Sequence, residues 1–281
     1  MNRKFEKIEW EQKTQVRAHA LLHYAIPHPR PERKYRLFDT ATYGGKMTDH
    51  AARRIRKKID LFFQLSPKRL IFNEVSRRFQ YFQINFVTLT ISCKRLIGSK
   101  EGYEKLLAPF LRKLRQLGKI SYVWKGEFQK RGQPHWHITT NNFLHMSWVR
   151  NEWNNLQKRA GYLDEYYKEH GHDNAPSTEV KSVRNLKRID LYLAKYLSKG
   201  DSTGRWEGKV WGCSDNLKLG TQFSFSTTFE DDETVIEAIS KGKAVLKRLD
   251  TFSITEAEDI KGLLTNVRKA ELEKYLKELA H

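Results

Sequence analysis

Apolar and polar residues alternate with two periodicities along this chain, one typical of strands and one typical of helices. Residues 86–91 are rich in β-branched side chains and predict a buried central strand. A short turn at residues 129–133, where Gly132 can take a positive φ, predicts that the runs on either side pair as a hairpin. Strand patterns occupy residues 69–72, 79–91, 120–128, 134–140 and 178–183, with shorter ones around Val210 and at 221–228.

The helical rhythm is clearest after residue 99, where leucines and aromatic residues recur every three or four positions up to Gly118. Thr48 is a suitable N-cap for an earlier helix, and Pro67 ends it. Helices are therefore predicted at residues 48–66, 99–117 and 185–199 and from about Ser147, with a polar loop at 161–176.

The order of these elements predicts an α+β fold in which an antiparallel sheet carries helices on one face. Three parts are expected. Residues 1–67 form a basic N-terminal arm and helix, and the prolines between positions 27 and 31 indicate that residues 1–47 are irregular. Residues 68–229 form the main domain, and residues 230–281 form a tail of one or two charged helices.

The charge of the chain indicates its class of binding partner, because 52 Lys and Arg against 33 Asp and Glu give a formal net charge of +19. Such a balance attracts polyanions, chiefly nucleic acid. The excess lies in the first 229 residues, since residues 230–281 hold 9 basic and 12 acidic side chains. The first helix should present a basic face to DNA through Arg53, Arg54, Lys57 and Lys58.

Two cysteines, Cys93 and Cys213, are too few for a disulfide framework or a zinc knuckle, and they indicate reduced thiols. The first residues do not resemble a signal peptide, and no apolar run approaches the length of a membrane span. We therefore expect a cytoplasmic protein with no membrane partner.

The candidate chemistry starts from two histidines in a predicted strand. Side chains alternate between the faces of a strand, so His135 and His137 point one way and Trp136 the other. With the turn centred on Arg131, Glu127 lies across from His135 and shares its face. Two imidazoles and one carboxylate suit Mn²⁺ or Mg²⁺ with open positions, although Zn²⁺ would also bind. The competing interpretation is a coincidental His-x-His pair, and the carboxylate in register argues against it.

A second candidate group lies on the predicted helix at residues 185–199. Tyr192 and Tyr196 are four residues apart and share a helix face, and Lys195 and Lys199 repeat that spacing on a neighbouring face. A phenol with its ordinary pKa of about 10 is a weak nucleophile. A nearby lysine and a metal-polarised phosphate activate it. The alternative is two amphipathic tyrosines beside solvated lysines, and the neighbouring metal-site prediction favours catalysis.

The histidine strand followed along the chain by the tyrosine helix resembles the HUH endonucleases. These enzymes are named after two histidines that flank a hydrophobic residue, here His135, Trp136 and His137. The strand at residues 86–90 and the two-tyrosine helix make the chain similar to rolling-circle replication initiators of the ORF2/gene-II group, found in microviruses and other small phages and plasmids. The resemblance covers about residues 68–229. It implies a five-stranded antiparallel sheet of RRM or ferredoxin-like topology, with the histidines on central strands and Glu127 as the acidic metal ligand.

The resemblance also implies an activity in the bacterial host cell. Such a nuclease nicks one strand of single-stranded or hairpin origin DNA, forms a 5′-phosphotyrosine bond, leaves a 3′-OH primer for a host DNA polymerase, and later rejoins the strands. Tyr196 is expected to make the initiating cut and Tyr192 the terminating one. No GxxxxGK[ST] phosphate-binding loop is present, so strand separation would fall to a host helicase.

Two alternatives stay open at this stage. A single-tyrosine HUH transposase would need only one of the two tyrosines. A non-catalytic module that binds single-stranded nucleic acid would place stacking aromatic residues on the open face of the sheet. The predicted register instead places His and Glu there.

Overall fold

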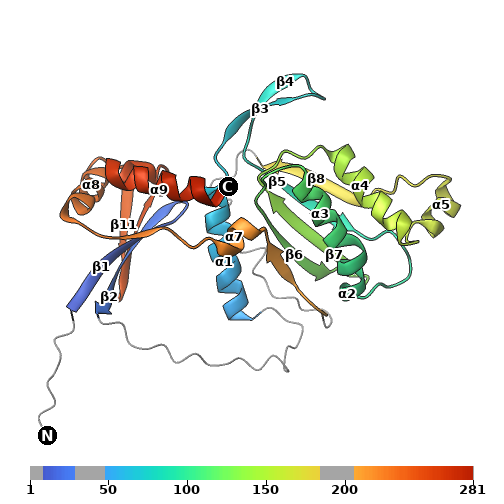
Figure 1. Cartoon of the computed structure of the whole chain (residues 1–281), viewed down its shortest axis with the longest axis horizontal. Helices are drawn as coiled ribbons and strands as arrows, with labels where there is room; N and C mark the ends of the chain where they lie inside the picture. The colour runs from blue at the N-terminus through green and yellow to red at the C-terminus, as the bar shows by residue number, and fades with distance from the viewer. Residues whose placement is uncertain (1–8, 29–47, 184–205, 281) are drawn as a thin grey trace, which may run out of the picture. The chain divides into compact units, whose positions relative to one another are not determined.

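The computed structural model of the chain describes residues 9–28, 48–183 and 206–280. They form two compact units, each built on its own five-stranded antiparallel sheet (Figure 1). The central unit spans Thr42–Gly220, and the terminal unit combines Met1–Ala41 with Thr221–Leu279. Within the described ranges, no helix is both long enough and apolar enough to cross a membrane.

The central unit begins with a helix and a hairpin and continues as an alternation of strands and helices. The hydroxyl of Thr48 caps the first helix as predicted, accepting a hydrogen bond from the Ala51 N–H at 3.1 Å. The elements of the central unit are α1 (Asp49–Gln64), β3 (Arg69–Asn73), β4 (Arg78–Phe82), β5 (Ile84–Thr90), α2 (Ser99–Gly102), the π-helical turn η2 (Tyr103–Leu107), α3 (Ala108–Gln116), β6 (Tyr122–Phe128), β7 (Pro134–Thr140), α4 (Met146–Arg159), α5 (Asp164–His170), β8 (Thr178–Val183), β9 (Trp211–Cys213) and α7 (Asp215–Leu219).

The main sheet of the central unit has the strand order β8-β5-β7-β6-β9, and every neighbouring pair is antiparallel. The chain runs through it as strand, helix, strand, strand, helix, strand before β9 extends one edge. This is the β-α-β-β-α-β arrangement of ferredoxin-like and RRM folds. The predicted α+β fold with a five-stranded antiparallel sheet is confirmed.

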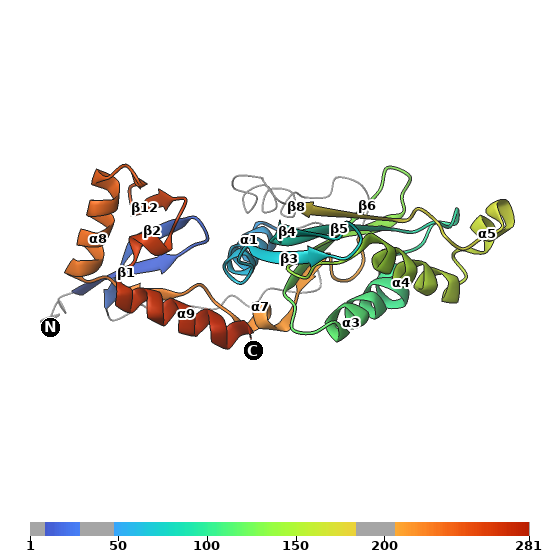
Figure 2. The ribbon, with the colours of Figure 1, turned by 90° about the horizontal axis from the view of Figure 1, so that it is seen from above.

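The two faces of this sheet differ in chemistry because side chains alternate along each strand. Helices α3 and α4 cover one face (Figure 2). On that face Trp136 is fully buried, with its ring 6.0 Å from the ring of Trp153 on α4. The core beneath the helices also contains Val87, Leu89, Trp124, Ile138, Leu106, Phe110 and Leu114. The apolar residues of the strands thus leave His135, His137 and Glu127 to the other face.

Helices α5 and α7 of the central unit were not predicted. Residues 161–176 were expected to be a polar loop, but α5 forms within them and ends at Gly171, which has a φ of 72°. None of its residues is buried, so no apolar stripe marks it in the sequence. Acidic residues in its first turn and basic residues in its last turn stabilise it through the helix dipole.

The terminal unit corrects the expectation for both ends of the chain. Residues 9–28 are a strand pair rather than an irregular arm, and the tail contains a hairpin between its two helices. The sheet order is β10-β1-β2-β12-β11. The elements are β1 (Glu9–Val16), β2 (Ala20–His28), β10 (Ser224–Ser226), α8 (Phe229–Ser240), β11 (Ala244–Arg248), β12 (Phe252–Ala257), the 3₁₀ turn η3 (Lys261–Leu263) and α9 (Asn266–Ala280).

The reason for this error is that β1 and β2 pair with each other while their outer partners come from the far end of the chain. Strand β1 pairs with β10, and β2 pairs with β12. Of the residues in β1, only Thr14 and Val16 are buried, so the strand lacks a clear apolar alternation. Pro27 sits beyond the part of β2 that pairs with β12, where its missing N–H costs no ladder bond on that side.

Asp231 ties helix α8 to helix α9 within the terminal unit. Its carboxylate accepts hydrogen bonds from the N–H and hydroxyl of Thr228 at 3.0 and 2.9 Å and from Arg268 Nε at 3.3 Å, and the residue is 6% exposed. Burial raises the pKa of Asp231, but the bonds from Thr228 and the charge of Arg268 outweigh burial and hold this pKa below its ordinary value.

Asp231→Asn is expected to lower the free energy of unfolding by ~1–3 kcal/mol at pH 7, because it weakens a buried charged network. A depressed folded-state pKa contributes stability above the unfolded value of about 3.9, and this contribution is lost as pH falls through the folded pKa. The difference in urea midpoint between the two proteins should therefore shrink from pH 7 towards pH 3. An equal difference at both pH values would contradict this, and the exposed Glu233→Gln in the same helix is the control.

Candidate metal centre

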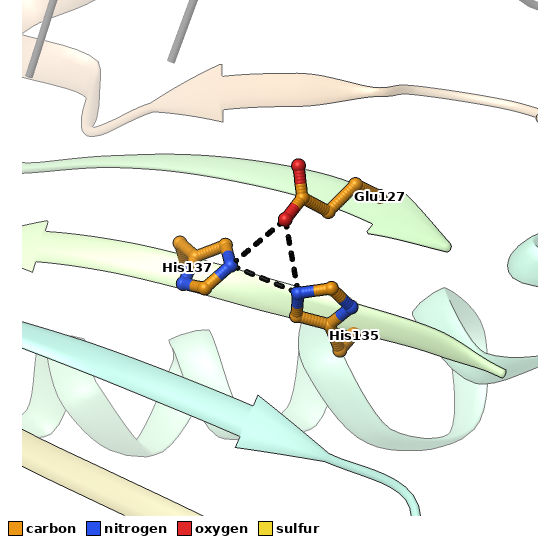
Figure 3. Close-up of side chains that lie close together, drawn as sticks. All are labelled: Glu127, His135 and His137. Carbon is orange, nitrogen blue, oxygen red and sulfur yellow. Dashed lines mark hydrogen bonds and ion pairs between the residues drawn. The ribbon is translucent and has the colours of Figure 1, made fainter. Parts of the chain in front are cut away.

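Strands β6 and β7 bring the three predicted ligands together on the face of the sheet away from α3 and α4. Glu127 lies directly opposite His135, and His137 is two residues further along the same face of β7. Glu127 Oε1 lies 3.1 Å from His135 Nε2 and 3.2 Å from His137 Nε2, and the two Nε2 atoms are 2.9 Å apart (Figure 3). Among the residues that the structure describes, no other group of three or more His, Cys, Asp or Glu brings its donor atoms together in this way.

The size of this triangle fits a divalent ion. Two ligand atoms at ~2.1 Å from one ion are ~3.0 Å apart at a right angle and ~3.4 Å apart at a tetrahedral angle. The observed distances of 2.9, 3.1 and 3.2 Å are closer to the first value. The three atoms are therefore close enough together to bind one divalent ion, to which Glu127, His135 and His137 would supply one oxygen and two nitrogen ligands.

The protonation states of the cluster suit cation binding. Burial raises the pKa of the Glu127 carboxyl, but its hydrogen bonds with His135 and His137, and their charges, outweigh burial and hold that pKa well below its usual range. Burial lowers the pKa of His137, and the charges of His135 and Lys125 act in the same direction against the opposing effect of Glu127. At pH 7 Glu127 is ionised and His137 is neutral, which are the forms that ligate a metal.

Strand β5 holds the ring of His137 in place. Thr88 lies opposite His137 in the register, and its Oγ1 is 3.2 Å from His137 Nδ1. The ring of Phe86 stacks on the imidazole with centroids 5.3 Å apart and an interplanar angle of 18°. With Nδ1 bonded to the hydroxyl, Nε2 is turned towards Glu127. The predicted strand thus contributes positioning residues to the site.

Lys125 belongs to this face and was not singled out from the sequence. It lies opposite His137, is 1% exposed, and its Nζ is 3.5 Å from Glu127 Oε2. The strand alternation contained the necessary information, because positions 125 and 127 share a face. Its side chain therefore places a further nitrogen atom beside the Glu127 carboxylate.

Gly126 is a further residue whose importance appears only in three dimensions. A Cβ atom at this position would lie 2.3 Å from Cζ2 of Trp206 and 3.0 Å from Nε1 of Trp136. Trp206 packs against Phe128, with ring centroids 5.0 Å apart. The absence of a side chain therefore lets Trp206 support β6 directly behind the ligands. Trp206 is too distant in sequence for this contact to be predicted.

Of the other predicted site residues, the structure describes only those on α1. Tyr192, Lys195, Tyr196 and Lys199 lie outside the described residues. Arg53, Arg54 and Lys57 are exposed on α1, and the Arg54 guanidinium lies 6.0 Å from the ring of Trp211. Lys58 departs from the expected DNA-facing role, because its Nζ donates to the carbonyl oxygens of Lys218 at 3.0 Å and Gly220 at 2.7 Å. It anchors α1 to the end of α7.

Comparison with known families finds a match to the replication-associated proteins of the ORF2 and gene-II-protein family, over residues 84–201. The matched segment starts with β5, contains β6, β7 and β8 and thus the Glu127, His135 and His137 cluster, and includes the tyrosine segment. It covers less than half of the chain, and it supports a relationship with rolling-circle replication initiators. Neither the curated proteins nor the solved structures give a match.

Proposed function

We propose that this protein starts rolling-circle replication by nicking one strand of origin DNA with a tyrosine nucleophile and later rejoins the strands. The observation that carries the proposal is the convergence of Glu127, His135 and His137 on a β-α-β-β-α-β sheet, inside the segment that matches replication-associated proteins. The basic charge of the chain supports a nucleic-acid substrate. A non-catalytic module would have no need of three convergent ligands.

In this proposal Glu127, His135 and His137 hold Mn²⁺ or Mg²⁺. The ion, when bound, withdraws charge from the scissile phosphate. The hydroxyl oxygen of Tyr196 attacks phosphorus as its proton is lost to solvent. The bond from phosphorus to the 3′ oxygen breaks, and that oxygen takes up a proton to give a 3′-OH. The 5′ side stays bound as a phosphotyrosine, while Lys195 and Lys199 stabilise the charge that develops.

The energy of the broken phosphodiester is retained in the phosphotyrosine bond, so rejoining needs no nucleotide cofactor. The substrate would be single-stranded or hairpin origin DNA in the cytoplasm of a bacterial host. A host DNA polymerase would extend the 3′-OH, and a host helicase would separate the strands ahead of it.

The chemistry of the two product ends tests this proposal. Single-stranded DNA carrying the origin, cut by the protein with Mn²⁺, should give a 3′ end that a DNA polymerase extends without prior treatment. The 5′ end should resist labelling by a polynucleotide kinase even after phosphatase and protease treatment, because the tyrosine stays esterified to the 5′ phosphate. Products with a free 5′-phosphate and a 3′-OH would indicate a water nucleophile and overturn the tyrosine mechanism.

The exposed basic face of α1 should contribute to DNA binding. Replacing Arg53, Arg54 and Lys57 with alanine together should weaken binding of single-stranded DNA and reduce the slope of log K against log salt by up to ~2, about 0.7 for each phosphate contact. The matched control removes Lys100, Arg112 and Lys113, which are equally exposed on the helices that cover the other side of the sheet. Equal salt slopes for both triple variants would exclude a specific role for α1.

A further inference from the structure

The hairpin of β3 and β4 is the part of the central unit that the proposed mechanism leaves unexplained. Its strands pair only with each other among the described strands and form a separate two-stranded sheet that leads into β5 (Figure 1). Its turn is held by Asn73, whose Oδ1 accepts hydrogen bonds from the N–H groups of Val75 at 3.0 Å and Ser76 at 3.3 Å. The hairpin is therefore an ordered projection.

The register places one leucine and three aromatic side chains on one face of this hairpin. Leu70 lies opposite Tyr81, and Phe72 lies opposite Phe79, so that all four side chains point the same way. They are exposed by 57%, 70%, 49% and 69% respectively. The rings of Phe72 and Phe79 are 5.3 Å apart at 62°, which presents their edges and faces to solvent. We refer to these four residues as the aromatic face.

The opposite side of the hairpin is where it is fixed to the rest of the central unit. Phe82 is buried and packs edge-on against Phe143, with centroids 5.3 Å apart. The guanidinium of Arg69 lies 5.1 Å from the Phe82 ring and donates to the Asn141 carbonyl at 2.7 Å. These contacts hold the base of the hairpin, so the exposure of the aromatic face does not result from a detached segment.

Charge identifies the class of partner. Lys68, Arg77 and Arg78 are exposed on the hairpin, and Glu74 is the single acidic residue between positions 66 and 83. Exposed aromatic rings combined with cations are the features that bind single-stranded nucleic acid, because bases stack on the rings while the cations meet the phosphates. A second copy of the chain meeting this face would bring like charges together.

We propose that the aromatic face stacks bases of single-stranded DNA next to the cleavage site, and this rests on the proposed nuclease function. Strand β5 joins the hairpin to the site, and Thr88, beside His137, is four residues from its start at Ile84. That distance is ~13 Å at ~3.3 Å per residue. That is the separation between the site and the base of the hairpin, which about four stacked nucleotides at ~3.4 Å each would span. The hairpin would hold DNA flanking the scissile phosphate.

The test replaces the rings while keeping apolar side chains. Phe79→Leu combined with Tyr81→Leu should weaken binding of a fluorescent single-stranded oligonucleotide by ~10-fold or more, in line with the loss of stacked bases. Its salt slope should not change, because no charge is removed. Phe229→Leu, which alters a ring 75% exposed in the terminal unit, is the matched control. Unchanged affinity in the double variant would overturn the proposal.

A second measurement keeps the proposal testable if the double variant folds poorly. Photocrosslinking of the unaltered protein to DNA containing 5-iodouracil should place crosslinks on residues 70–81, and crosslinks confined to other segments would contradict it. Sedimentation should show that the unaltered protein and the double variant have the same mass. If the unaltered protein is a dimer and the double variant is a monomer, the aromatic face is a contact between two copies of the chain and the proposal is wrong. Because binding and crosslinking require no cleavage, they can succeed even if the nuclease proposal fails.

Discussion

His135→Ala is expected to reduce the rate of strand cleavage by ~1,000-fold or more, since it removes one of three ligands and with it the metal-derived stabilisation of several kcal/mol. Binding of single-stranded DNA should change little, because affinity comes mainly from phosphate contacts by Lys and Arg. Glu127→Ala should behave in the same way, because its carboxylate oxygen lies within 3.2 Å of both histidine nitrogens. Cleavage and binding are measured on the same oligonucleotide with Mn²⁺.

Two controls separate loss of the metal from loss of the fold. His172→Ala removes an exposed histidine from the same unit and should leave cleavage unchanged. Thr88→Val removes the hydroxyl that orients His137, so its defect should be partly reversed by higher Mn²⁺ concentration, unlike that of His135→Ala. Cleavage by His135→Ala at the normal rate, in the presence of the divalent ion, would show that the site is assigned to the wrong residues.

Tyr196→Phe is expected to abolish initial nicking, while Tyr192→Phe should nick once and fail to release circles. Rolling-circle synthesis needs a first cut and then a second cut while the first 5′ end is still held by protein. A second tyrosine four positions away in the sequence can make that cut, and the 3′-OH it frees can attack the older phosphotyrosine. Nicking and circle release are measured separately on a circular template.

The outcomes of this pair distinguish classes of enzyme. Full initiation and full circle release by either variant would mean that one tyrosine is sufficient, as in the single-tyrosine HUH transposases. Loss of nicking in Tyr192→Phe with normal nicking in Tyr196→Phe would reverse the proposed order of the two residues. Phe in place of Tyr removes only the hydroxyl, so each variant tests the nucleophile alone.

The metal-site part of the central unit could be predicted because it depends on residues close together in the sequence. The cluster of Glu127, His135 and His137 depends on one hairpin whose turn and alternation are both visible in the sequence, and the structure forms that register. The same alternation assigned Trp136 to the core, where it is fully buried. Short-range periodicity was sufficient for this cluster because β6 and β7 are joined by a short turn and pair directly.

The terminal unit could not be predicted because its sheet depends on pairings between residues far apart in the sequence. Strand β1 pairs locally with β2, but its second sheet neighbour is β10, about 210 positions later, as in the pairing of Lys13 with Ser226. Lys58 shows the same limit for a single side chain: its charge suggested DNA, yet its partners are backbone carbonyls from Lys218 and Gly220. The packing of Trp206 over Gly126 likewise depends on a distant contact.

The central claim is that a tyrosine of this chain becomes covalently joined to DNA at a metal site formed by Glu127, His135 and His137. The most direct measurement is to incubate the protein with labelled single-stranded origin DNA and Mn²⁺, isolate any complex that survives SDS, and map the modified peptide by mass spectrometry. We predict an adduct on Tyr196 or Tyr192 that disappears with a chelator and in His135→Ala. Cleavage of the DNA without any SDS-stable adduct, or an adduct on another residue, would contradict it.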